Sequence, residues 1–178
     1  MRSPGRVSSA RVNRKRFFDA AAHWDAKAVA AGLAEDRSLA RAIDERGRTP
    51  LHRCARTNGA KDGRDAAAGL EVARALLAAG ADPNAVHDIP DEGGSFRATP
   101  LWYAVAWGRN PRLVRLLLDA GAAPRGCLWA CVWADDLEMA KTLLKARAPL
   151  GEVFGGETPL QYAARLKRAA FVKLFRSR

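Results

Sequence analysis

The chain has 178 residues, of which 48% are hydrophobic and 28% are charged. This balance is typical of a single folded domain and excludes a wholly disordered chain. The net charge of +11 at first suggests nucleic acid as a partner.

The excess charge lies at the two ends of the chain. Residues 1–16 and 165–178 carry 12 of the 30 basic residues and none of the acidic ones, so 18 basic and 19 acidic residues lie between them. We expect residues 1–16 to be a flexible basic tail and residues 17–178 to form the folded domain. We also expect no secretory signal, because no apolar run follows the N-terminal charges, and no segment that spans a membrane.

Helices are favoured throughout the domain, because Ala, Leu and Arg are abundant while Val, Ile and Thr are scarce. Residues 17–34 predict two short helices. Beyond them, three segments share one motif: TPLHRCAR at 49–56, TPLWYAVAWG at 99–108 and TPLQYAARLK at 158–167. In each, Thr suits a helix N-cap and Pro suits the first helical position. Each motif therefore predicts a short inner helix, whose small residues let neighbouring helices approach closely.

A second motif follows the first. It reads LLAAGADPNA at 76–85 and LLLDAGAAP at 116–124, with a degenerate copy, LLKARAPL, at 143–150. The apolar spacing predicts an amphipathic outer helix, which Gly80 and Gly121 end because glycine adopts positive φ readily. Arg147 occupies that position in the degenerate copy, where the left-handed conformation costs a non-glycine residue about 1–2 kcal/mol. We expect this copy to be irregular.

The segment GCLWACVWADDLEMAKTLL, at 126–144, fits a worn copy of the whole unit, because Gly126 to Leu143 has the same 17-residue offset as Thr99 to Leu116. The repeats predict five units. Their bounds are roughly 17–43, 44–85, 86–125, 126–151 and 152–178.

This pattern resembles the ankyrin repeat, which has a period of about 33 residues and a T-P-L-H-x-A signature. The resemblance covers residues 17–178 and is most specific in DERGRTPLH at 44–52 with GLEVARALLAAGADPNA at 69–85. It implies an all-α solenoid of helix pairs with hairpin fingers, and a binding role on the concave side. The style is similar to small stand-alone bacterial ankyrin proteins, some of which are regulators, some secreted effectors and some toxin-neutralising proteins. These alternatives stay open.

Two segments exceed the repeat. Residues 57–69 lengthen the connection between two helices, and we expect a plain solvent loop there. Residues 87–98 lengthen a finger, and we expect Phe96 and Arg97 on it to contact a partner. Long loops without structure of their own are often functional.

No arrangement of residues predicts catalysis, a metal site or a cofactor. The chain has no glycine-rich phosphate loop, no H-E-x-x-H and no Cys-x-x-Cys. The resemblance gives His52 a structural role, bonding backbone at its turn. The three cysteines (Cys54, Cys127 and Cys131) are too few for a disulfide framework and indicate a reducing compartment. We expect a cytoplasmic monomer, with a secreted effector as the alternative.

Aromatic residues gather on the inner helices, and Trp, Tyr and Arg are the residue types enriched in interface hot spots. In ankyrin proteins the positions after the small pair face the concave groove. The resemblance therefore implies a protein partner bound by Arg53, Arg56, Tyr103, Trp107, Trp133, Tyr162 and Arg165, together with Phe96 and Arg97. Trp102 and Trp129 occupy the signature's His position and are expected to pack between units. Two alternatives remain: the tryptophans only fill gaps between irregular units, or the basic ends bind nucleic acid or an anionic surface.

Overall fold

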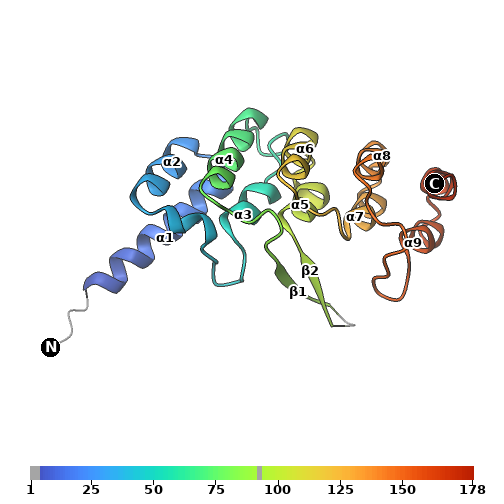
Figure 1. Ribbon diagram of the computed structural model, residues 1–178, viewed down its shortest axis with the longest axis horizontal. Coiled ribbons are helices and arrows are strands. Elements are labelled where there is room, and N and C mark those ends of the chain that lie inside the picture. The colour runs from blue at the N-terminus through green and yellow to red at the C-terminus, as the bar shows by residue number, and fades with distance from the viewer. Residues whose placement is uncertain (1–4, 92–93) are drawn as a thin grey trace.

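The computed structural model describes residues 5–91 and 94–178, and most of that part of the chain is helical. Figure 1 shows an elongated molecule in which two rows of helices run along the long axis. The elements are α1 (Gly5–His23), α2 (Ala26–Glu35), η1 (Arg37–Arg41), α3 (Pro50–Arg56), α4 (Ala66–Ala78), β1 (His87–Asp91), β2 (Gly94–Ala98), α5 (Pro100–Tyr103), η2 (Ala104–Gly108), α6 (Pro111–Asp119), α7 (Cys127–Ala134), α8 (Leu137–Lys145), α9 (Pro159–Arg165) and α10 (Ala169–Arg176).

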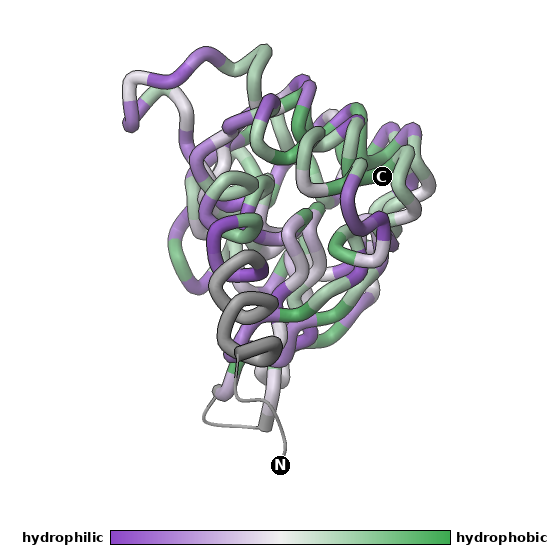
Figure 2. The backbone as a smooth tube through the Cα atoms, turned by 90° about the vertical axis from the view of Figure 1, so that its left-hand side faces the viewer, coloured by the Kyte–Doolittle hydropathy of each residue, from purple (hydrophilic) through white to green (hydrophobic). Residues whose placement is uncertain are grey.

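The helices form successive antiparallel pairs. Contacts join α1 to α2, α3 to α4, α5 and η2 to α6, α7 to α8, and α9 to α10. The first members of the pairs also contact one another along an inner row, from α1 through α3, α5, η2 and α7 to α9. Figure 2, turned so that the N-terminal end faces the viewer, shows the pairs one behind another.

The shared motif caps its helices as the sequence predicts. The side chains of Thr49, Thr99 and Thr158 accept hydrogen bonds from backbone N–H groups at the starts of α3, α5 and α9, and a proline follows each threonine. His52 and Gln161 return the bond, since each accepts from the N–H of its capping threonine. Two different side chains therefore perform the same capping role.

Leucines from both rows form the core. Leu51, Leu101 and Leu128 of the inner row are buried, as are Leu76, Leu117 and Leu143 of the outer row. The burial follows from the helical spacing of these apolar positions, which places them on the face that meets the other row. No helix within the described residues is long and apolar enough to cross a membrane.

The extended finger is a β-hairpin, which fits the hairpin fingers that the resemblance implies, although a long loop without structure of its own was expected at 87–98. β1 and β2 pair antiparallel, with His87 opposite Ala98 and Ile89 opposite Phe96. The hairpin projects from the inner row near α5 (Figure 1). A β-branched and an aromatic residue facing each other stabilise such a pair.

The N-terminal boundary also differs from the expectation. α1 begins at Gly5, so helical backbone runs through most of the segment 1–16 that we expected to be a flexible tail. Residues 1–4 of that segment lie outside the described part. The division of the domain into five units stays a prediction.

The insert at 57–69 is not a plain solvent loop. α4 already starts at Ala66, and the preceding segment is bonded to the end of α1. Thr57 Oγ1 donates to the Ala22 carbonyl at 2.7 Å, and Arg64 Nη1 donates to the His23 carbonyl at 2.7 Å. The insert is thus held against the C-terminal end of α1 by these two hydrogen bonds.

The turn at Arg147 keeps the regular geometry. Its φ is +60°, close to the left-handed values of Gly80 and Gly121. Ala148 donates to the Leu143 carbonyl at 2.9 Å, just as Ala122 donates to the Leu117 carbonyl at 2.9 Å. The irregularity expected here is absent, and the turn keeps its shape at the cost of strain in Arg147.

Candidate partner-binding groove

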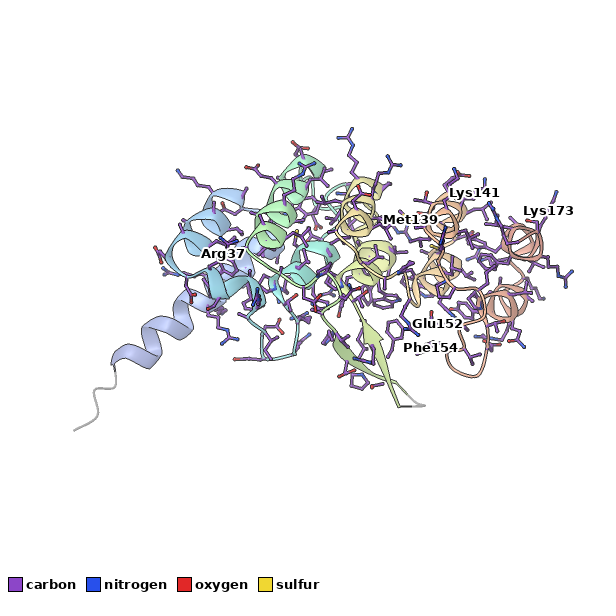
Figure 3. The ribbon with its side chains drawn as sticks, viewed as in Figure 1. Arg37, Met139, Lys141, Glu152, Phe154 and Lys173 are labelled. Atoms are coloured by element: carbon purple, nitrogen blue, oxygen red, sulfur yellow. The ribbon has the colours of Figure 1, made fainter. Side chains whose placement is uncertain are left out.

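A row of ring contacts crosses the inner elements α5, η2, α7 and α9 together with the hairpin. Trp107 meets Trp102 at 4.8 Å between ring centroids, and Trp102 meets Phe96 of β2 at 4.7 Å. Phe96 meets Phe154 at 4.8 Å, and Phe154 lies in the loop between α8 and α9 (Figure 3). Trp129 of α7 continues the row to Phe154 at 5.9 Å and to Tyr162 of α9 at 4.8 Å. We call this set of six side chains the aromatic row.

An arginine lies over each end of the aromatic row. The guanidinium carbon of Arg56 is 5.6 Å from the centroid of the Trp107 ring, and that of Arg165 is 5.0 Å from the centroid of Tyr162. Such cation–π contacts stabilise by about 0.5–1 kcal/mol at exposed sites. The structure therefore has rings at the centre of this surface and an arginine at each end of the aromatic row.

The aromatic row lines a pocket of about 370 Å³, which we call the aromatic pocket. Its wall combines residues of the hairpin, the inner helices and the loop before α9. The lining residues are Ile89, Pro90, Phe96, Trp102, Ala106, Trp107, Trp129, Ala130, Trp133, Phe154, Gly155, Glu157, Tyr162 and Arg165.

A second, polar pocket adjoins it, with a volume of about 610 Å³; we call it the basic pocket. It is lined by Ala22, Arg53, Arg56, Thr57, Asn58, Lys61, Asp62, Ala106, Trp107, Arg109 and Trp133. Ala106, Trp107 and Trp133 belong to both pockets, so the two form one groove.

Trp133 is the most exposed aromatic residue of the groove. It is 55% exposed on α7, whereas Trp107 is half-buried at the end of η2. Gly108 holds η2 against α3, because a Cβ at this position would lie 2.3 Å from the Ala55 carbonyl oxygen. Close packing at Gly108 therefore fixes where Trp107 projects.

Tyr103 does not belong to the accessible surface, and its assignment as a binding residue is wrong. The side chain is only 4% exposed, and its hydroxyl lies 2.7 Å from Nδ1 of His87. Tyr103 instead joins α5 to the first residue of the hairpin. Burial raises its pKa above the ordinary tyrosine value.

The other predicted residues divide into two groups. Phe96, Trp107, Trp133, Tyr162 and Arg165 line the aromatic pocket, and Arg53 and Arg56 line the basic pocket. Arg53 is already paired, with Asp19 at 3.3 Å and Asp44 at 3.7 Å. Arg97 is exposed on β2 and lines neither pocket.

Sequence reasoning missed the loop before α9. Phe154 and Glu157 from this loop form one wall of the aromatic pocket, and Phe154 pairs its backbone with Glu157 in a short bridge. Glu157 receives Arg165 Nε on both carboxylate oxygens, at 2.9 and 3.0 Å. Only the apolar residue at 154, within a polar glycine-rich stretch, hinted at this packing.

The cysteines and His52 of the inner row are buried and take part in packing. Burial raises the pKa of the Cys54 thiol to about 12 and also raises those of Cys127 and Cys131. Burial lowers the pKa of His52 to about 4, so its imidazole is neutral near pH 7. Within residues 5–91 and 94–178, no three His, Cys, Asp or Glu side chains gather closely enough to hold a metal ion.

The ankyrin-repeat family model matches this chain at residues 46–88 and 97–127, which contain α3, α4, α5, η2 and α6. Most of the hairpin lies between the two matched segments. No curated protein sequence is significantly similar to this chain.

Proposed function

Because this chain carries ankyrin repeats at residues 46–88 and 97–127, we propose that it binds another protein through the groove on its inner row of helices. Ankyrin repeats are generally protein–protein interaction modules and are typically not enzymes. The groove, formed by the aromatic and basic pockets, is the concave binding surface of the proposal.

The proposal extends the repeat beyond the matched segments, to a solenoid of five helix-pair units. Two observations support the extension. Helix α9, outside the match, has the same threonine–proline start as α3 and α5. Helix α7 has Gly126 in place of the threonine, and Glu152 accepts from the Gly126 N–H at 2.7 Å. Glu152 therefore accepts from the equivalent backbone N–H as His52 and Gln161 do in α3 and α9, whereas the bond to the threonine side chain has no counterpart in α7.

One observation carries the proposal: Trp133 is 55% exposed where the two pockets meet. When a partner covers this half-exposed tryptophan and the aromatic side chains beside it, burial of apolar surface stabilises the complex by about 25 cal/mol per Å². Tryptophan is also among the residues that most often dominate binding energy at interfaces. The hairpin supplies Phe96 to the same pocket and forms its second wall.

An affinity pull-down from native lysate, analysed by mass spectrometry, tests the proposal. The baits are the full chain, the Trp133→Ala variant and the Ile43→Ala variant. Ile43 is 56% exposed and lines neither pocket, so its substitution is a matched loss of exposed apolar surface. We expect a protein captured by the full chain and by Ile43→Ala that is depleted with Trp133→Ala.

Capture that is equal with all three baits would contradict the groove assignment. A Lys15→Glu/Arg16→Glu bait examines the alternative, because both side chains are exposed on α1. If this bait and added salt each abolish capture, and the recovered material is nucleic acid, the basic ends are the functional surface instead.

A further inference from the structure

The basic residues that line the basic pocket outnumber its acidic residues, so the pocket carries a net positive charge. Arg56, Lys61 and Arg109 are exposed in it, and none of them forms an ion pair within the described residues. The lining includes one acidic residue, Asp62. The chain body as a whole is near neutral, so this local excess is a property of the groove.

The aromatic pocket, by contrast, has no net charge. Its two ionised residues, Glu157 and Arg165, neutralise each other at 2.9 Å. The remaining wall is formed mainly by rings and by aliphatic residues of the hairpin. Such a surface favours one large apolar side chain over a charged one.

One donor in the aromatic pocket lacks an acceptor. Trp129 is only 8% exposed, and its Nε1–H has no hydrogen-bond partner within the described residues. An unpaired buried donor destabilises the folded chain. The Nε1 atom itself is covered by the protein, so the proposal below rests on the rings and the charges of the two pockets.

We propose that the groove binds an extended acidic segment of the partner protein, whose one large apolar side chain fills the aromatic pocket while its carboxylates lie on Arg56, Lys61 and Arg109. This inference rests on the proposed function, since it names the partner's chemistry at the same surface. Because Trp107 and Trp133 line both pockets, a single short segment reaches the two. Apolar burial supplies affinity, while the complementary charge supplies orientation and a faster association.

A peptide-display selection with random twelve-residue sequences on the full chain tests the partner's chemistry directly. We expect enriched sequences with several Asp or Glu residues and one Phe, Trp, Leu or Met. Enriched sequences that are neutral or basic, or no enrichment over a Trp107→Ala/Trp133→Ala chain, would overturn the proposal.

The enriched peptide is then synthesised with a fluorescein label, and its affinity is measured by anisotropy against three proteins. The Arg56→Glu/Lys61→Glu variant reverses two charges in the basic pocket. The Arg74→Glu/Arg112→Glu variant makes the same charge change at exposed positions on α4 and α6. We expect the first variant to bind at least about tenfold more weakly than the native chain, and the second to change affinity less than about twofold.

An equal loss of affinity in both variants would mean that the peptide responds only to the overall charge of the protein. That result would overturn the proposal that the acidic segment binds in the groove. The two proposals fail separately. A protein whose capture depends on Trp133 but whose bound segment is neutral or basic would leave the groove as the working surface and overturn the acidic segment alone.

Discussion

Trp24 donates its indole N–H to the backbone carbonyl of Cys54 at 2.9 Å, and so joins the end of α1 to the neighbouring inner helix α3. The ring is 4% exposed and fills the space beside Gly59 and Gly69. The single ring thus links α1, α3 and the insert between α3 and α4.

Replacing Trp24 with Phe should lower the free energy of unfolding by about 2–3 kcal/mol. The change removes one buried hydrogen bond and opens a small cavity, while the Cys54 carbonyl keeps the bond that it accepts from the Thr57 N–H at 3.3 Å. Urea unfolding followed by circular dichroism measures the effect. Trp133→Phe, at an exposed tryptophan, is the control and should change stability by less than about 0.5 kcal/mol. Equal effects at the two positions would show that Trp24 does not have this linking role.

His52 should make stability depend on pH. Its Nδ1 accepts from the Thr49 N–H at 3.1 Å, and its Nε2 faces the Ala98 carbonyl at 3.3 Å, so the neutral ring suits both partners. Its pKa is about 4 in the folded chain against an ordinary value of 6.5, so the unfolded chain binds a proton first as pH falls. The stabilisation is complete above pH 6.5 and is lost progressively toward pH 4, by on the order of 3 kcal/mol in all.

A His52→Gln variant isolates this effect, because Gln161 already performs the same capping role in α9. The variant should be less stable than the native chain at pH 7, since it lacks the ring contact with Ala98. Its denaturant midpoint should fall less between pH 7 and pH 4 than that of the native chain. If the denaturant midpoints of the two proteins fell by the same amount between pH 7 and pH 4, His52 would not be the source of the pH dependence.

Arg147→Gly should raise the free energy of unfolding by about 0.5–1 kcal/mol. The native residue is held at φ +60°, a conformation that glycine adopts without strain, and its side chain is exposed. The greater freedom of glycine in the unfolded chain offsets part of the gain. Thermal melting checks the sign. Lys145→Gly, inside helix α8, should instead destabilise by about 1 kcal/mol, so the introduction of glycine has opposite effects two positions apart.

Glu152→Ala should destabilise the chain by about 1–2 kcal/mol, because the carboxylate accepts the Gly126 N–H just before α7, a helix that has no side-chain N-cap bond. Figure 3 shows Glu152 in the loop before α9. The other partner of Glu152 is Arg125, at 3.0 Å, whose side chain is 77% exposed. Arg125→Ala should therefore cost less than about 0.5 kcal/mol. A larger loss with Arg125→Ala than with Glu152→Ala in chemical unfolding would mean that the ion pair, not the cap, matters.

Local signals predicted the regular parts of the fold. The threonine–proline starts and the leucine spacing placed α3, α5, α6 and α9, because capping and apolar periodicity act within one or two turns. The two strands of the hairpin were not predicted residue by residue, because Pro90 and Gly94 weaken the alternation typical of strands.

Long-range packing decided which candidate site residues are accessible. Trp107, Trp133, Tyr162 and Arg56 all line the groove, as equivalent positions of a repeat that share a face would, and their role in binding stays a prediction. Tyr103 occupies a similar position but is buried, because His87 arrives from the hairpin and bonds to its hydroxyl. Phe154 lines the aromatic pocket from the loop before α9, and the local sequence does not predict the course of that loop.

The affinity of the purified partner, measured by isothermal titration calorimetry, tests the groove most directly. Three proteins are compared: the native chain, Trp133→Ala and Ile43→Ala. The groove predicts a loss of at least about tenfold in affinity, or roughly 1.4 kcal/mol, for Trp133→Ala alone. An affinity that is the same for all three proteins, with the fold intact by circular dichroism, would contradict it.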